Sequence, residues 1–225
     1  TTFYFDDIVF EIEESGNTIP LTPEEKKEVL TNAMENWVKG MMEACGGYVK
    51  AWDVVNEPLA GADKDGDGWY DLQSVNNVSA EDAKNNFYWQ DYLGDDYVRT
   101  AIQLTRKYGP EDMKLFINDY NLESDWDDNM KLKSLINWIE RWEKDGTKID
   151  GIGTQMHVSY YLNSATQKSK EDHVVKMFEL LKASGKLIKI SELDMGIVDE
   201  KGNEIKTANL TFEQQLLMSE YYKFI

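Results

Sequence analysis

Four short apolar segments alternate with helical patterns along most of the chain, and this alternation constrains the fold more than any other feature. The segments are residues 49–55, 114–118, 149–156 and 186–191. The spacing of apolar residues predicts helices between Thr22 and Gly46, at 80–108, at 126–143 and at 170–183, and a last helix from Thr211. Short strands separated by amphipathic helices are typical of a parallel sheet with helices packed outside it, so we predict an α/β fold.

A polar cluster directly follows each predicted strand. The clusters are Asn56-Glu57-Pro58, Asn118-Asp119-Tyr120-Asn121, Gln155-Met156-His157 and Ser191-Glu192-Leu193-Asp194. In parallel βα folds the loops after the carboxyl ends of the strands converge on one open face, and chemistry gathers there. We therefore expect these clusters to form one site.

Two glutamates stand out among these polar residues. Glu57 and Glu192 each follow an apolar strand, and closure of the sheet into a barrel would bring both to the same mouth. Hydrolysis of a glycosidic bond requires such a pair, one carboxyl protonated to act as acid and the other ionised. A strand-terminal glutamate can also be a helix cap or an ion-pair partner, but the amide, imidazole and aromatic neighbours favour the catalytic interpretation.

The segment Trp52-Asp53-Val54-Val55-Asn56-Glu57 resembles the acid/base signature of the family 10 glycoside hydrolases, the (β/α)8 endo-xylanases. Ser191-Glu192-Leu193-Asp194 resembles their nucleophile signature, and the two clusters between them match the family in the right order. The resemblance implies a TIM barrel of which this chain carries strands four to seven. It also implies retaining endo-hydrolysis of the β-1,4-xylosidic linkages of xylan through a glycosyl-enzyme.

The same resemblance implies a role for each polar residue. Glu57 would be the general acid/base and Glu192 the nucleophile, while Asn56 would bind the sugar 2-hydroxyl. His157 would orient Glu192 and would itself be held by Asp194. The residues implied around the subsite at the cleavage point are Gln155, Asn118 and Tyr120.

The family's first three strands and its eighth strand have no counterpart in these residues. We therefore expect residues 18–225 to be the C-terminal part of a catalytic domain without its eighth strand. The remaining barrel strands would come from the same longer chain or from a companion fragment. Residues 1–17 resemble the last strand of a β-sandwich carbohydrate-binding module inserted into the barrel, although an edge strand native to the barrel domain is the alternative.

An acidic loop follows the first motif. Asp63, Asp65, Asp67 and Asp71 occupy positions one, three, five and nine of a calcium-loop pattern with Gly68 at six, and calcium prefers such oxygen ligands. Position twelve is Ser74 instead of a bidentate glutamate. The loop is therefore either a structural calcium site or a solvated acidic turn, and no cofactor is expected to be required for catalysis.

Charge and substrate size limit the partners. With 24 Lys+Arg against 42 Asp+Glu the net charge is -18, so the chain is expected to repel nucleic acid. No apolar run approaches the roughly 20 residues of a membrane helix, so no membrane insertion is expected. The expected partner is xylan or a xylo-oligosaccharide, and a polymer of that kind favours a secreted, cell-surface or periplasmic protein. The alternative functions are a non-catalytic polysaccharide-binding protein and a related β-1,4-glucanase.

Overall fold

A computed structural model describes residues 19–225 of the chain. The proposed module strand within residues 1–17 lies outside the described residues, so it stays a prediction. Helix α1 (Pro23–Cys45) confirms the helix predicted between Thr22 and Gly46, and it begins at a capping box formed by Thr22 and Glu25. The helix ends where Gly46 adopts a left-handed conformation with φ 52°. Within residues 19–225 no helix is long and apolar enough to cross a bilayer.

The centre of the fold is a four-stranded parallel sheet in the order β1-β2-β3-β5. Its strands are β1 (Ala51–Asn56), β2 (Lys114–Asp119), β3 (Gly151–Thr154) and β5 (Leu187–Ile190). The four predicted strands are therefore confirmed, and they pair in the order of the sequence. Asn56 pairs with Asn118, and Asn118 pairs with Gly153, so the polar ends of three strands lie at the same level.

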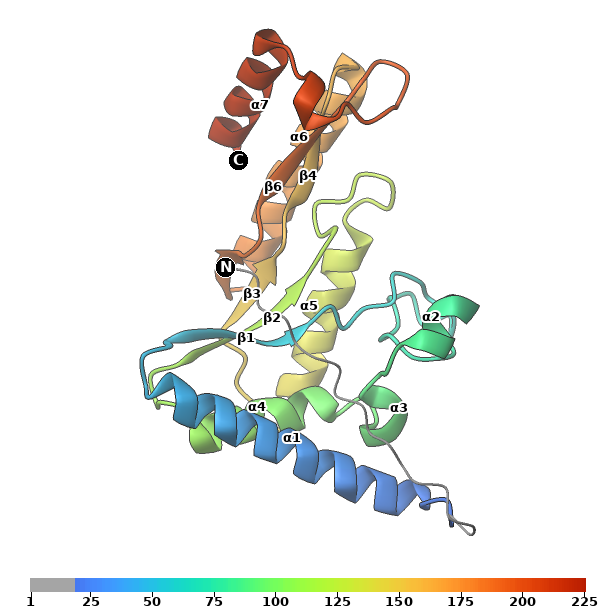
Figure 1. The fold of residues 1–225 in the computed structure, drawn as a ribbon, viewed down its shortest axis with the longest axis vertical. Coiled ribbons are helices and arrows are strands. Elements are labelled where there is room, and N and C mark those ends of the chain that lie inside the picture. The colour runs from blue at the N-terminus through green and yellow to red at the C-terminus, as the bar shows by residue number, and fades with distance from the viewer. Residues whose placement is uncertain (1–18) are drawn as a thin grey trace.

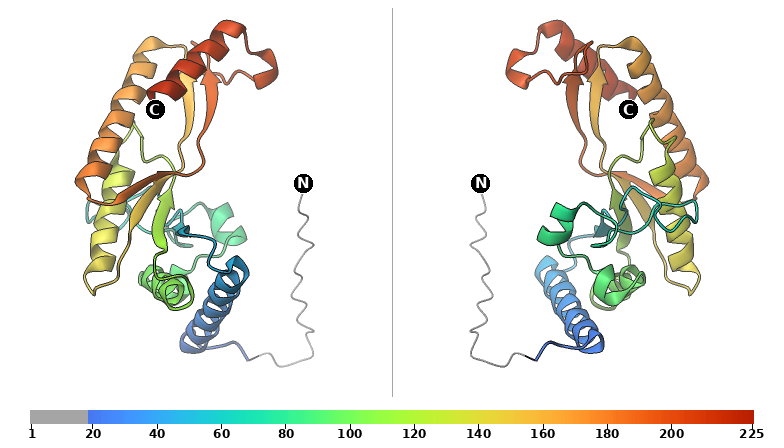
Figure 2. Two further views of the ribbon diagram at one scale, coloured as in Figure 1. Left: turned by 90° about the vertical axis from the view of Figure 1, so that its left-hand side faces the viewer. Right: turned by 90° about the vertical axis from the view of Figure 1, so that its right-hand side faces the viewer.

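Helices connect these strands. Helix α4 (Tyr97–Tyr108) joins β1 to β2, α5 (Met130–Glu143) joins β2 to β3, and α6 (Ser164–Ala183) leads to β5. Figures 1 and 2 show α5 and α6 along one side of the sheet and α1 packed beside α4 at its lower end. The apolar stripes of these helices and the central strands form the core, in which Leu115, Ile117 and Ile152 are fully buried.

The predicted helix at 80–108 is wrong. The segment forms three helices, α2 (Ala80–Asn85), α3 (Gln90–Leu93) and α4. Two interruptions separate them: Asn86 is extended with φ −115° and ψ 156°, and Gly94 has φ 77°. Helix α6 begins at Ser164, earlier than predicted, because the side chain of Asn163 caps its N-terminus.

A second parallel sheet was not expected. Its strands are β4 (His157–Tyr161) and β6 (Asp194–Val198), which follow β3 and β5 in the chain and lie side by side in Figure 1. The predicted strand at 149–156 therefore stops at Thr154, because Met156 adopts φ 61° before β4 begins. A 3-10 turn (Thr207–Asn209) and α7 (Phe212–Phe224) follow β6, and α7 packs on both strands of this sheet.

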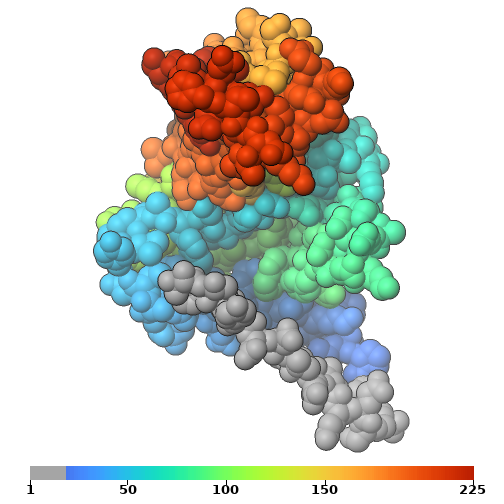
Figure 3. Space-filling view, turned by 45° about the horizontal axis from the view of Figure 1, so that its top comes forward, coloured from blue at the N-terminus to red at the C-terminus, as the bar shows by residue number. Residues whose placement is uncertain are grey.

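The sheet is an open arc within the described residues. The central strands β2 and β3 are buried, but on the edge strand β5 the apolar residues Leu187, Ile188 and Ile190 are 49%, 42% and 38% exposed. On the other side, Trp37 of α1 is 67% exposed. In the space-filling view the C-terminal part of the chain, orange to red, lies above the connection from β1 to α4, cyan to green (Figure 3).

Candidate active site

The two candidate carboxylates lie in one hydrogen-bonded network at the carboxyl ends of the strands. Nδ2 of Asn118 donates to Oε1 of Glu192 (2.9 Å) and to Oδ1 of Asn56 (2.8 Å). Nε2 of Gln155 donates to Oε1 of Glu57 (2.7 Å). The same Nε2 lies 3.4 Å from Oδ1 of Asn56. Asn118 and Gln155 therefore each contact one glutamate, and both contact Asn56 between them.

Asn118 is fixed before any ligand arrives. It is 1% exposed, and its Oδ1 accepts a hydrogen bond from Oγ of Ser191 (2.7 Å). Gly153 on the neighbouring strand makes room for it, since a Cβ there would lie 2.4 Å from Oδ1 of Asn118. An amide with all its hydrogen bonds made is held in one orientation, which is what positioning of Glu192 requires.

The backbone of Glu57 is left-handed. Its φ is 53°, which is uncommon for a residue other than glycine and costs of order 1–3 kcal/mol, so it persists only where the surroundings impose it. The N–H of Glu57 donates to the carbonyl of Asn118 (2.7 Å), which ties it to the end of β2. The Glu57 side chain consequently turns toward Gln155 and Asn56.

His157 bridges the second carboxylate to an aspartate. Its Nε2 lies 3.3 Å from Oε2 of Glu192, and its Nδ1 lies 3.0 Å from Oδ1 of Asp194. The hydrogen bond with Asp194, with a smaller contribution from Glu192, raises the pKa of His157 above its ordinary value. Glu192 thus accepts hydrogen bonds on both oxygens, from Asn118 on one side and His157 on the other.

A buried ion pair supports the network from below. Nζ of Lys131 lies 2.8 Å from Oδ1 of Asp119, and the two side chains are 5% and 0% exposed. Oδ2 of Asp119 accepts the N–H of Leu59 (3.3 Å), which follows Glu57 by two residues. Nζ of Lys131 also lies 3.3 Å from the ring centroid of Tyr120. Burial raises the pKa of Asp119, while Lys131 opposes that rise.

Two polar cavities open beside Glu57. One of about 310 Å³ is lined by Glu57, Gln73 and the aromatic residues of the segment before α4. The other, of about 490 Å³, is lined by Glu57, Gln73 and Tyr120 among others. Tyr120 therefore faces the same space as Glu57. These cavities provide room for a ligand next to one of the two carboxylates.

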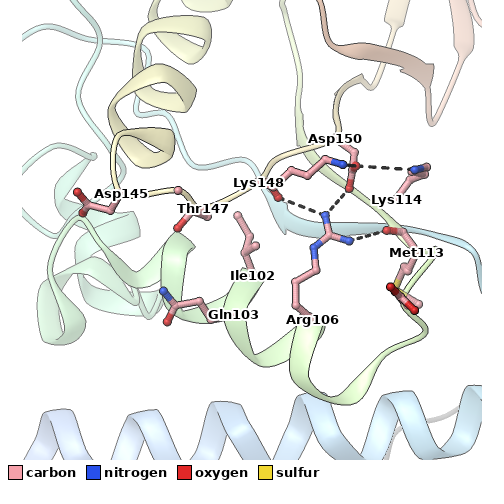
Figure 4. A pocket seen from close by; sticks show the side chains of 11 residues that line it. Ile102, Gln103, Arg106, Met113, Lys114, Asp145, Thr147, Lys148 and Asp150 are labelled. Atoms are coloured by element: carbon pink, nitrogen blue, oxygen red, sulfur yellow. Dashed lines mark hydrogen bonds and ion pairs between the residues drawn. The ribbon is translucent and has the colours of Figure 1, made fainter.

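A further cavity lies elsewhere, at the opposite ends of the strands. It measures about 520 Å³, and Figure 4 shows Arg106 in it, pointing toward Asp150 and the carbonyls of Met113 and Lys148. Asp150 in turn lies near the ammonium groups of Lys114 and Lys148. Arg106, Lys114 and Lys148 all face Asp150, so these charged groups join the lower ends of the strands to α4.

The acidic loop brings together three of its four predicted metal ligands. Oxygens of Asp63, Asp65 and Asp67 lie within 4.8 Å of one another, and all three residues are exposed. Asp71 is not in this group, because its Oδ2 accepts the N–H of Lys64 (2.8 Å). Asp67 also pairs with Arg141 (2.7 Å), which lowers its pKa. The three oxygens fit a hard cation, although Arg141 already neutralises one of them.

The structure therefore gathers all eight predicted catalytic and binding residues at one end of the sheet. Sequence reasoning did not assign a role to Ser191, Lys131 or Gln73, each of which contacts a residue of the network. Ser191 could have been found, since it directly precedes Glu192 in the motif. The other two contacts depend on the path of the chain between distant segments.

Comparison with known proteins identifies the family. Residues 16–223 match Glycosyl hydrolase family 10. "Endo-1,4-beta-xylanase A" of Halalkalibacterium halodurans is 32% identical over 84% of this chain and 41% of its own length. "Exoglucanase XynX" of Acetivibrio thermocellus is 31% identical over 71% of this chain and 12% of its own.

A solved structure, the endo-1,4-beta-xylanase from Caldicellulosiruptor owensensis, superposes with a TM-score of 0.67 at 26% identity. The match covers 94% of this chain and 54% of that one. The chain thus spans about half the length of these relatives or less. Because the family match covers most of the sequence and the solved relative shares the fold, the chain belongs to glycosyl hydrolase family 10 and forms part of its (β/α)8 barrel.

Proposed function

We propose that this chain is the part of a retaining endo-1,4-β-xylanase domain that carries both catalytic carboxylates. One observation carries the proposal: Glu57 and Glu192 share a single network of amides at the carboxyl ends of the strands. The family membership and the relatives named as xylanases support xylan as the substrate.

The first step would form a glycosyl-enzyme. A carboxylate oxygen of Glu192 attacks the anomeric carbon while the proton of Glu57 passes to the glycosidic oxygen, and the carbon–oxygen bond to the leaving sugar breaks. Asn118 and His157 hold the two oxygens of Glu192, which restricts the carboxylate to one plane of attack. Such prior positioning is worth a large part of the rate enhancement in reactions of this kind.

The second step would release the sugar. Glu57, now ionised, takes a proton from a water molecule whose oxygen attacks the anomeric carbon, and the bond to Glu192 breaks. The hydrogen bond from Gln155 to Oε1 of Glu57 holds the side chain in position for this step. Asn56, held by Asn118, is placed to bind the 2-hydroxyl of the sugar.

The rest of the barrel would close on the two edges of the sheet. Exposed apolar side chains on β5 mark one edge. Beside β1 a cavity of about 200 Å³ is lined by Trp37, Trp52, Val54 and Trp89 among others. Apolar surface of this kind favours pairing with further strands and helices. These would come from the same longer chain or from a companion fragment. A polymeric substrate favours a secreted, cell-surface or periplasmic protein.

Reducing-sugar release from arabinoxylan and from mixed-linkage β-glucan tests the proposal in the full-length protein. Glu192→Gln is expected to abolish activity, whereas Glu200→Gln, an exposed glutamate in the turn after β6, is expected to leave it unchanged. Products that first appear with the β configuration would establish retention. Activity on β-glucan alone would favour the glucanase function suggested by the relative named exoglucanase. Binding of xylan without turnover would favour the non-catalytic alternative.

A further inference from the structure

The two ends of the loop between Pro58 and Gln73 lie side by side, next to Glu57. Its two ends form a narrow antiparallel ribbon, in which Leu59 bridges Leu72 and the N–H of Gln73 donates to the carbonyl of Pro58 (2.7 Å). The N–H of Ala60 donates to the carbonyl of Asp71 (2.8 Å). Leu59 and Leu72 are 0% and 4% exposed, so the ribbon is anchored in the core.

Helix α5 clamps the outer part of this loop through Tyr70. The N–H of Tyr70 donates to Oγ of Ser134 (2.9 Å), and the carbonyl of Tyr70 accepts Nε1 of Trp138 (2.9 Å). Its hydroxyl donates to Asp127 (2.9 Å), and Arg141 pairs with Asp67. A loop fixed at both its base and its outer part presents its side chains in defined positions.

Gln73 uses this rigidity to contact the backbone of Glu57. Its Nε2 donates to the carbonyl oxygen of Glu57 at 2.6 Å. The preceding peptide is held as well, because the N–H of Glu57 donates to the carbonyl of Asn118 (2.7 Å). A left-handed glutamate persists where its surroundings impose the conformation, and these two hydrogen bonds impose it from opposite sides.

We infer that Gln73 is a positioning residue for the acid/base Glu57: it holds the Glu57 peptide in its left-handed conformation and so aims the carboxyl at the reacting oxygen. This inference rests on the proposed function. The acidic loop thereby has a role in the site, because its contacts with α5 fix the position of Gln73.

The variant Gln73→Met keeps the length of the side chain and removes the donor. In the full-length protein we expect kcat on xylan to fall about 10- to 100-fold with KM within about twofold, since displacement of a general acid affects the transition state. Gln103→Met is the matched control. It makes the same substitution at an exposed position of α4, beside the cavity at the opposite ends of the strands.

A substrate with a good leaving group separates positioning from general damage. With a 2,4-dinitrophenyl xylobioside the first step needs no acid, and added azide can attack the anomeric carbon in the second step, where it displaces the carboxylate of Glu192 without a general base. Azide is expected to raise the turnover of Gln73→Met on this substrate and to leave the wild type unchanged. A structural defect would not respond to azide.

Three results would overturn the inference: kcat of Gln73→Met within about twofold of the wild type, an equal loss in Gln103→Met, or a loss that azide does not relieve. Failure of the wild type itself to hydrolyse xylan or glucan would instead refute the proposed function. In that case a crystal structure of Gln73→Met still decides whether Gln73 holds the backbone of Glu57 in its left-handed conformation. A φ of Glu57 that departs from 53° in the variant supports this role of Gln73, and an unchanged φ overturns it.

Discussion

Removal of Lys131 is expected to destabilise the fold far more than removal of an ordinary surface lysine. Nζ of Lys131 lies 2.8 Å from Oδ1 of Asp119, whose side chain is 0% exposed. The variant Lys131→Met therefore leaves a buried carboxylate without its partner. Breaking a buried pair in this way costs about 3–5 kcal/mol. Loss of the contact with the Tyr120 ring adds about 0.5–2 kcal/mol.

Urea unfolding followed by tryptophan fluorescence measures this cost. With a denaturant slope of about 2 kcal/mol per molar, the two costs together should lower the midpoint by about 1.8–3.5 M. The matched control is Lys133→Met in the same helix, whose partner Asp128 is 60% exposed, and there the expected cost is below about 1 kcal/mol. The double variant Lys131→Met/Asp119→Asn should recover much of the loss, because no charge is then left buried.

The pH dependence of the destabilisation caused by Lys131→Met provides a further test. In Lys131→Met the buried Asp119 has a folded-state pKa above its unfolded value, so its ionisation opposes folding at neutral pH. The destabilisation should therefore shrink as the pH falls through the folded-state pKa. A midpoint shift no larger than that of Lys133→Met, or a cost independent of pH, would refute this account of the pair.

Three further predictions concern the site and its loop. The pKa of His157 should lie above 6.5 in an NMR titration and should fall in the variant Asp194→Asn. The stability contributed by the protonated imidazole should be lost as the pH rises through that pKa. A pKa of His157 that is unchanged in Asp194→Asn would count against the pairing. Gly153→Ala should lower kcat about 10- to 100-fold by displacing Asn118, and steady-state kinetics equal to those of the wild type would show that the amide is dispensable. If the acidic loop holds calcium, millimolar calcium should raise the unfolding temperature and Asp65→Asn should abolish the rise; superimposable melting curves in calcium and chelator would identify a solvated turn.

The sheet could be predicted because each strand carries its own signal. Segments such as Phe116-Ile117 are apolar and are followed at once by polar residues, and a parallel sheet places all such ends at one edge. Helices α1 and α7 likewise begin directly after Thr22 and Thr211, where the local sequence predicts them. Such local patterns do not depend on how the rest of the chain is arranged, which is why they were predicted correctly.

The errors arose where a local pattern had two interpretations. The helical spacing across residues 80–108 concealed breaks at Asn86 and Gly94, and the backbone at each is non-helical. The run His157-Val-Ser-Tyr-Tyr has the aromatic and β-branched character of a strand, but it directly follows a predicted strand and no second strand was predicted there. Its pairing with β6 depends on a partner far along the chain, so the sequence of β4 alone could not establish it.

The contacts that hold Glu57 show why a motif is an incomplete description of a catalytic residue. The motif residue Asn56 reaches the carboxylate at 3.4 Å, whereas the shorter hydrogen bond comes from Gln155 of another strand end. The Glu57 peptide is held by Asn118 and by Gln73, and the second of these depends on a loop that α5 clamps through Tyr70. Since a left-handed glutamate is unfavourable by itself, its orientation is a property of these distant segments together. Substitutions in the loop should therefore alter catalysis in proportion to how far they release Gln73, even where they leave every motif residue in place.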